Sequence, residues 1–293
     1  MENTLLLGNG FVRALYEGAV NWRALLKGKS AIELDNLTLL YEAGRLANGS
    51  EDDDFKRSME DELRKQITED KIKKSAEGVN DFGEYLRNCN INNIITTNMD
   101  EGIETILCTK NGYALIGSDS AEKVYSIRRK IILEKDGHNI TIWKIHGDIK
   151  NVKSISFGFD QYVGRLSRIE QYVKGKYSSD KANCSVPMID KIKNNKFDGI
   201  SWIELFFNSN IFIAGFGLDY SEIDLWWILI KRCRIFEKLK GSKNRIVYLY
   251  SDFDCISPDK LEEKRNVLLT FEVENEYMMS GSKYIESLFS HIK

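Results

Sequence analysis

The stretch NINNIITTNMDE, residues Asn90–Glu101, decides the fold that we expect for this chain. Ile94 and Ile95 are adjacent β-branched residues with no polar residue between them, which is typical of a strand buried on both faces. Side chains just past the end of such a strand lie at the carboxyl edge of a parallel sheet, where open α/β sheets bind ligands. The polar residues that follow this strand are Thr96, Thr97, Asn98 and Asp100.

A second stretch has the same design. TIWKIHGDI, residues Thr141–Ile149, is an apolar run that ends in polar residues around His146. If both runs are parallel strands of one sheet, their polar ends meet at the same edge. We therefore expect Asn98 and His146 to face each other across one pocket.

Two further apolar runs end in a Gly-x-Gly turn followed by a helical pattern. Thr4–Leu7 precedes Gly8-Asn9-Gly10-Phe11, and Asn210–Ala214 precedes Gly215-Phe216-Gly217. This arrangement lets backbone N–H groups approach a pyrophosphate at a helix N-terminus. The signal is weak alone, because Arg13 replaces the third glycine of the dinucleotide fingerprint, and a tight turn explains the glycines equally well.

The alternation of strands and helices predicts an α/β fold, a Rossmann-like, mostly parallel sheet with helices on both faces. We expect a single catalytic domain over residues 1–293, with a helical insertion at 31–88 and a smaller lid-like insertion at 150–209. In a parallel sheet, all four polar clusters share one edge.

Several local predictions rest on weaker sequence patterns. The charge run Glu51–Ser75 predicts a solvated helix with one narrow apolar stripe. Val267–Val273 is apolar enough to predict a strand, and Lys174–Ser185 is polar and predicts a loop. The Asp-Gly hairpin signal predicts that His138 is an exposed turn residue. The Ser221 to Asp224 spacing predicts a helix start, with Asp224 serving as a cap.

Composition excludes several classes of protein. The chain has 293 residues, 42% hydrophobic and 29% charged, with a net charge of −2, which is ordinary for a globular protein and argues against direct nucleic-acid binding. Its five cysteines form no CxxC pair, so neither a disulfide framework nor a zinc site is expected. We find no signal peptide or membrane-length apolar run and expect a cytoplasmic location with no membrane partner.

The ordered landmarks resemble the sirtuin-like NAD-consuming family. They are Gly8-Asn9-Gly10-Phe11, Thr96-Thr97-Asn98-Met99-Asp100, His146-Gly147 and Gly215-Phe216-Gly217. Sirtuins proper carry Gly-Ala-Gly, then Thr-Gln-Asn-Ile-Asp, then His-Gly. The Thr-Thr-Asn form, with Trp22 and a Leu-Leu pair soon after the first glycines, is closer to the sirtuin-like effectors of bacterial anti-phage systems. The resemblance extends from Leu5 to about Trp227.

Three departures from sirtuin deacylases shape the functional expectation. The sequence has no set of four zinc-binding cysteines, Thr97 stands where the sirtuin motif has Gln, and the Pro-x-Phe-Arg loop is absent. The resemblance therefore implies simple NAD⁺ cleavage rather than protein deacylation, with NAD⁺ as substrate and no metal.

The expected chemistry assigns roles to individual residues. Cleaving NAD⁺ breaks a C–N glycosidic bond through an oxocarbenium-like transition state. Asn98 can fix ribose hydroxyls or orient water, and His146 can act as a general base. The resemblance assigns the nicotinamide carboxamide to Asp100. The NAD⁺-contacting set that it implies is Gly8, Asn9, Gly10, Phe11, Thr97, Asp100, Gly215 and Gly217.

Each residue also has a simpler interpretation. Asn98 could cap the helix that follows its strand, and His146 could be a core histidine bonded to a backbone carbonyl. The functional interpretation rests on the two residues occurring together with the glycine loops.

Three functions remain open from the sequence. The first is an NAD⁺ glycohydrolase that depletes NAD⁺ in abortive infection. Because no sensor domain is evident, we expect activation by homo-oligomer assembly or by a separately encoded sensor or regulatory protein, with Glu51–Ser75 as a candidate surface. The second is a non-catalytic module that senses NAD⁺ or an ADP-ribose derivative. The third is an NAD-dependent deacylase or ADP-ribosyltransferase.

Overall fold

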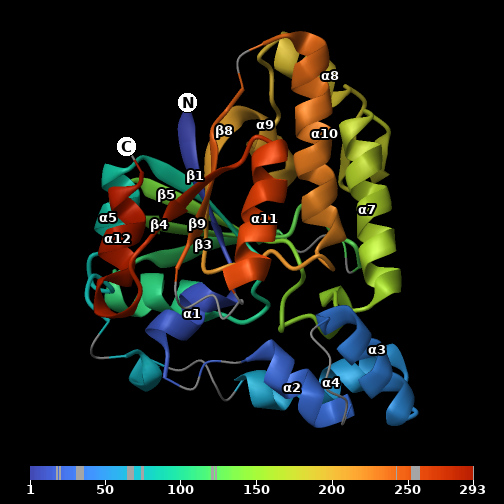
Figure 1. Cartoon of the computed structure of the whole chain (residues 1–293), viewed down its shortest axis with the longest axis vertical. Helices are drawn as coiled ribbons and strands as arrows, with labels where there is room; N and C mark the ends of the chain where they lie inside the picture. The colour runs from blue at the N-terminus through green and yellow to red at the C-terminus, as the bar shows by residue number, and fades with distance from the viewer. Residues whose placement is uncertain are drawn as a thin grey trace.

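The computed structural model confirms the α/β prediction: a large, mostly parallel sheet lies between two layers of helices (Figure 1). The structure describes residues 1–17, 19, 21–30, 36–64, 69–73, 76–119, 122, 124–241, 243–251 and 258–292.

The sheet has eight strands, and six of them run parallel. The other two strands, β3 (Ala114–Asp119) and β4 (Lys130–Lys135), form an antiparallel extension at one side of the sheet. Crossover helices connect the parallel strands, as such pairing requires. In spatial order the strands are β10 (Glu274–Tyr277), β9 (Ile246–Tyr250), β8 (Ser209–Ala214), β1 (Glu2–Leu7), β2 (Ile91–Thr96), β5 (His138–Lys144), β4 (Lys130–Lys135) and β3 (Ala114–Asp119).

The four strands that precede the polar clusters are neighbours: β8, β1, β2 and β5. Their last residues are in register, because Leu7 pairs with both Ala214 and Thr96, and Thr96 pairs with Lys144. The residues that follow these positions therefore lie side by side. This confirms the prediction that the four polar clusters share one edge of the sheet.

Both faces of the central strands are buried, which explains their uninterrupted apolar sequence. Leu5 and Ile94 belong to one core with the helices α1 (Asn9–Leu15), α5 (Phe82–Asn88), α6 (Gly102–Thr105) and α12 (Tyr284–Ser290). Leu6 and Ile95 belong to the other core. The helices on that side are α7 (Phe159–Val173), α8 (Met188–Lys193), α9 (Leu205–Asn208), α10 (Ile223–Leu239) and α11 (Pro258–Thr270).

A third group of helices, α2 (Trp22–Ser30), α3 (Leu37–Ala47) and α4 (Asp52–Arg64), lies across the carboxyl edge of the sheet (Figure 1). Trp22, Tyr41 and Phe55 form a small core with Met99 and Phe157, so these helices pack directly on the loops that follow β2 and β5. We call this group the α2–α4 layer. It covers the edge where the candidate site lies.

Three local predictions are wrong. Val267–Val273 is mostly the end of α11 rather than a strand, because a short apolar run cannot be told from one buried helix turn by periodicity. The predicted loop at 174–185 contains a small hairpin, β6 (Tyr177–Ser179) and β7 (Ala182–Cys184). His138 is half-buried, and its Nδ1 lies 2.7 Å from the Tyr113 hydroxyl.

Parts of two predictions fall outside the described residues. The 31–88 insertion lacks its start, residues 31–35, among the described residues. The Glu51–Ser75 charge run lacks residues 65–68 and 74–75. In the described part of that run, α4 buries Phe55 and also Lys56, which pairs with Asp52, while Asp54 and Arg57 are exposed. No helix among the described residues is both long and apolar enough to cross a bilayer.

Candidate functional site

Asn98 lies two residues beyond β2 and is 2% exposed. Its side-chain Nδ2 donates to the backbone oxygen of Gly8, 3.2 Å away, and its backbone N–H donates to Thr96 Oγ1. Its Oδ1 is buried and has no hydrogen-bond partner among the residues that the structure describes. An unpaired buried acceptor is costly, so this oxygen is suited to receive a hydrogen bond from a ligand.

The interpretation of Asn98 as a helix cap is wrong. The helix that follows, α6, begins at Gly102, and Asp100 Oδ1 accepts a hydrogen bond from the Gly102 N–H at 2.8 Å. Asp100 thus performs the local backbone role that a cap would perform. Burial raises the pKa of the Asp100 carboxyl group.

His146 follows β5 and is 3% exposed. Its Nε2 lies 3.1 Å from Asp224 Oδ2 and 3.4 Å from Glu222 Oε2. The imidazole also meets the ring of Tyr162 edge-on at 5.5 Å. The ring is therefore held by side-chain carboxylates, which is not the arrangement expected of a core histidine bonded to a backbone carbonyl.

The carboxylates come from the segment that enters α10, beyond the second Gly-x-Gly turn. The prediction that Asp224 is a cap is wrong, because Asp224 is the second residue of the helix, its Oδ1 accepts from the adjacent Leu225 N–H at 2.9 Å, and its Oδ2 faces His146. Glu222, at the N-cap position of α10, makes no side-chain cap hydrogen bond. The sequence pattern that could have indicated these partners of His146 is a pair of carboxylates, two residues apart, after a glycine turn.

Helix α7 completes this cluster from the other side. Tyr162 donates to Glu222 Oε2 at 3.0 Å, and Arg165 Nη1 lies 3.5 Å from Asp224 Oδ2. Segment 150–209, predicted to be a lid, therefore supplies a wall of the site through α7.

The pKa values of the two carboxyl groups are shifted in opposite directions. Burial, with the neighbouring Asp224 charge, raises the pKa of Glu222 to about 7. Burial also acts on Asp224, but the opposing charge and hydrogen bond of His146, with the charge of Arg165, lower its pKa to about 2. Two neighbouring acids with separated pKa values are typical of sites that move protons.

His146, Glu222 and Asp224 have ligand atoms within 4.8 Å of one another, close enough for a cation to bridge. The position is not free of positive charge, because Arg165 already faces Asp224. Tyr162 also uses Glu222 as an acceptor. These neighbours favour a hydrogen-bonded, proton-sharing cluster over a metal centre.

The glycines of the two turns have a packing function. Gly10 N donates to Gly215 O at 2.7 Å, and Gly8 N donates to Ala214 O at 3.1 Å. A Cβ on Gly8 would lie 2.5 Å from Gly215 O, and one on Gly10 would lie 2.7 Å from it. The two turns are thus in direct backbone contact, and Gly215 adopts φ +58°, which favours glycine.

Gly217 is different, because a Cβ there would meet no atom of the described residues within 4 Å. Its carbonyl oxygen accepts a hydrogen bond from the Lys264 ammonium group on α11. This second turn therefore combines open space with a nearby cation, as an anionic ligand requires.

Alanine substitutions separate packing from ligand binding at these turns. Gly8→Ala is expected to cost about 1–3 kcal/mol of unfolding free energy, because the added methyl overlaps backbone. Gly217→Ala is expected to change stability by less than about 0.5 kcal/mol but to raise the Kd for NAD⁺. Urea unfolding and calorimetric NAD⁺ titration measure the two effects. Unchanged NAD⁺ affinity in Gly217→Ala would remove this residue from the binding set.

The remaining residues of the predicted NAD⁺-contacting set differ in how accessible their atoms are. The Phe11 side chain is fully buried against Phe82, and its backbone N–H donates to Gly8 O at 3.1 Å. Thr97 is 8% exposed, between Thr96 and Asn98. Asn9 Nδ2 is a second buried amide atom with no hydrogen-bond partner among the described residues.

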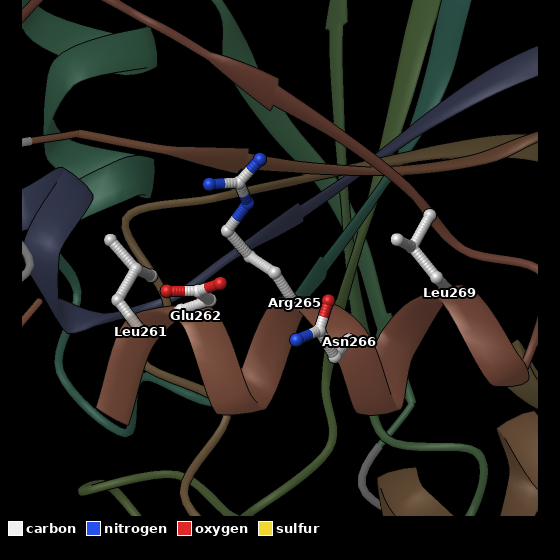
Figure 2. Close-up of a pocket in the computed structure, with 5 residues that line it drawn as sticks. All are labelled: Leu261, Glu262, Arg265, Asn266 and Leu269. Atoms are coloured by element: carbon white, nitrogen blue, oxygen red, sulfur yellow. The ribbon is translucent and has the colours of Figure 1, made fainter. Parts of the chain in front are cut away.

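A pocket of about 350 Å³ lies elsewhere, along α11. Figure 2 shows its five lining residues on successive turns of that helix, with the Arg265 side chain extending toward the strands. The Arg265 guanidinium lies 4.6 Å from the centre of the Tyr250 ring. None of the predicted site residues lines this pocket, so it is separate from the candidate site.

Three of the candidate side chains are buried in this structure, whereas Gly217 is exposed. Asn98, Asp100 and His146 are each at most 3% exposed. Met99, between the first two, packs into the core of the α2–α4 layer.

Comparison with known proteins adds no assignment to this geometry. No protein-family profile matches the chain, and no curated protein is significantly similar to it in sequence.

Proposed function

We propose that this protein is an NAD⁺ glycohydrolase that releases nicotinamide and ADP-ribose from NAD⁺. The observation that carries the proposal is the unpaired, buried Oδ1 of Asn98. It lies at the edge of the sheet where His146 also lies, beyond the neighbouring strand. The ordered sirtuin-like motifs of the sequence support the same reaction.

The chemistry follows from these groups. Asn98 Oδ1 accepts a hydrogen bond from a ribose hydroxyl or from the attacking water, which fixes the reacting sugar. His146 acts as general base, and the negative charge of Asp224 favours the oxocarbenium-like transition state. Nicotinamide departs with the electron pair of the glycosidic bond and becomes neutral.

The burial of Asn98 and His146 supports a role that needs a trigger. With Asn98 and His146 buried, the resting enzyme would spare cellular NAD⁺. Assembly with copies of itself, or binding of a separately encoded partner, would open it, in keeping with an anti-phage effector that acts by abortive infection.

A second candidate is a sensor that binds NAD⁺ or an ADP-ribose derivative without cleaving it. The backbone contact between the glycine turns already explains Gly8 and Gly10 without catalysis. Affinity without turnover, unchanged by substitution of Asn98, would favour this function.

Nicotinamide release from NAD⁺ tests the proposal. We expect release by the wild type, alone or with the products of neighbouring genes, and a loss of about 10²- to 10⁴-fold in His146→Ala. His138→Ala is the matched control, because that histidine bonds Tyr113 away from the site. Circular dichroism checks the fold. Absence of release under every condition, or full activity of His146→Ala, would refute the assignment.

A further inference from the structure

The His146 imidazole is the meeting point of three separate elements. It follows β5, it is contacted by Glu222 and Asp224 at the start of α10, and Tyr162 of α7 packs against its ring. All of these side chains are at least nine-tenths buried. Buried charges are retained only when they are paired, so the charges in this cluster must compensate one another.

Asp224 is the better-anchored of the two carboxylates. One of its oxygens accepts from Leu225 N–H at 2.9 Å, and the other lies 3.1 Å from His146 Nε2 and 3.5 Å from Arg165 Nη1. A carboxylate with so many donors stays ionised and is a poor proton acceptor. It is well suited to hold the imidazole in one orientation with a proton on Nε2.

Glu222 has the opposite character. Its Oε2 lies 3.4 Å from His146 Nε2 and accepts a neutral hydrogen bond from Tyr162. The groups facing it are His146, Asp224, Tyr162, Arg165 through Asp224, and Asp219 in the preceding loop. Two of these are acids, and they disfavour its ionised form.

We propose that Asp224 is a positioning residue for His146 and that Glu222 is the proton acceptor acting through it, an assignment that rests on the proposed NAD⁺ cleavage. In this step the attacking water oxygen gives its proton to His146 Nδ1 as it bonds to the ribose carbon, and nicotinamide leaves with the electron pair of the broken C–N bond. The Nε2 proton passes to Glu222, so the imidazole ends neutral and Glu222 ends protonated. The proton from water is thus stored away from the sugar.

The relay requires ionised Glu222 at the start. Burial raises the pKa of Glu222 to about 7, so the fraction able to accept a proton grows as pH rises through neutrality. Turnover should therefore increase between about pH 6 and pH 8. Glu222→Gln removes the acceptor and with it this pH dependence.

Nitrogen-15 NMR of the histidine rings tests the cluster without any substrate. The chain has only three histidines, so His138→Gln and His291→Gln assign the His146 signals. In the wild type we expect a proton on Nε2 and a change in the ring signals that follows the ionisation of Glu222, whose pKa is raised to about 7. Glu222→Gln should abolish that change, and Asp224→Ala should redistribute the Nε2 proton between the two ring nitrogens.

Kinetics supply the second readout. Glu222→Gln and Asp224→Asn are expected to lower kcat by about 10²-fold or more with little change in KM. Only Glu222→Gln should flatten the pH profile. Glu204→Gln is the matched control, since it neutralises another buried carboxylate, paired with Lys191 at 2.5 Å, outside the cluster.

The outcomes separate the two proposals. If neither the wild type nor any variant cleaves NAD⁺ but the His146 signals behave as expected, the cluster exists and the assigned reaction is wrong. If the change in the ring signals persists in Glu222→Gln, or Asp224→Ala leaves the ring unchanged, the relay is refuted. Stoichiometric binding of Zn²⁺ alone that displaces the His146 signals would also overturn it in favour of a metal centre.

Discussion

Asn98→Ala is expected to reduce nicotinamide release by roughly 10²- to 10³-fold, the usual effect of removing one preorganised polar group from a transition state. Its stability should change little. The variant loses the 3.2 Å hydrogen bond to Gly8 O, worth about 1 kcal/mol, but also removes the buried, unpaired Oδ1, which costs about 1–3 kcal/mol. Lost activity without lost stability is the signature of a residue retained for function.

Asn111→Ala is the matched control for this measurement. Asn111 is also a buried asparagine, but its Oδ1 accepts from Gly83 N–H, and its Nδ2 donates to the carbonyls of Val79 and Ile106. Removing it should cost roughly 2–3 kcal/mol in urea unfolding, because it leaves several backbone groups unpaired. If Asn98→Ala instead loses comparable stability and keeps full activity, Asn98 is a structural residue.

The residues at the carboxyl edge of the sheet could be predicted because the sequence patterns that indicate them are local. The apolar runs before Gly8, Thr96, His146 and Gly215 are each buried on both faces, and parallel strands align their carboxyl ends. That alignment is a geometric consequence of the fold class. The placement of Asn98, His146 and the glycine turns at one edge of the sheet therefore followed from the sequence once the strands were recognised.

The acidic cluster could not be predicted in the same way. The strand before Glu222 and Asp224, β8, lies two strands from β2 and three from β5, yet both carboxylates reach His146. Within its own segment Asp224 has a sequence context that equally predicts a cap. The partners of a side chain depend on tertiary packing, which local pattern does not contain.

The covering layer illustrates the same limit. The apolar residues Trp22, Tyr41 and Phe55 indicate amphipathic helices, but not that their apolar faces meet Met99 and Phe157 above the site. The Val267–Val273 error has a different cause, since three consecutive apolar residues satisfy either a strand or one turn of α11.

Lys144→Met is expected to be the most destabilising single substitution among those considered. Lys144 is fully buried, and its Nζ donates to the Asp100 carbonyl at 2.7 Å and lies 3.0 Å from Glu104 Oε1 and 3.3 Å from Asp148 Oδ2. These partners follow β2 and β5, so one ammonium group ties together the loops that carry Asn98 and His146. Leaving such carboxylates buried without their cation typically costs about 3–5 kcal/mol.

Urea unfolding measures this cost. Lys144→Met combined with Glu104→Gln should recover part of it, because the uncompensated charge is removed. Lys153→Met is the control, since its pair with Asp53 is more than one-third exposed at both partners and contributes at most about 1 kcal/mol. If Lys144→Met proves no more costly than Lys153→Met, the buried network is not holding the loops.

The pH dependence of the Lys144→Met variant gives an independent check. Burial already raises the pKa of Glu104 although Lys144 opposes it, so losing that cation raises the folded-state pKa further. A carboxyl group whose pKa is higher in the folded than in the unfolded state destabilises the fold as pH rises from the unfolded value through the folded one. The deficit of Lys144→Met should therefore be smallest near pH 4 and grow toward neutrality, and Glu104→Gln should remove much of that growth. A deficit that stays constant with pH would instead mean that lost packing of the lysine stem, rather than uncompensated charge, causes the destabilisation.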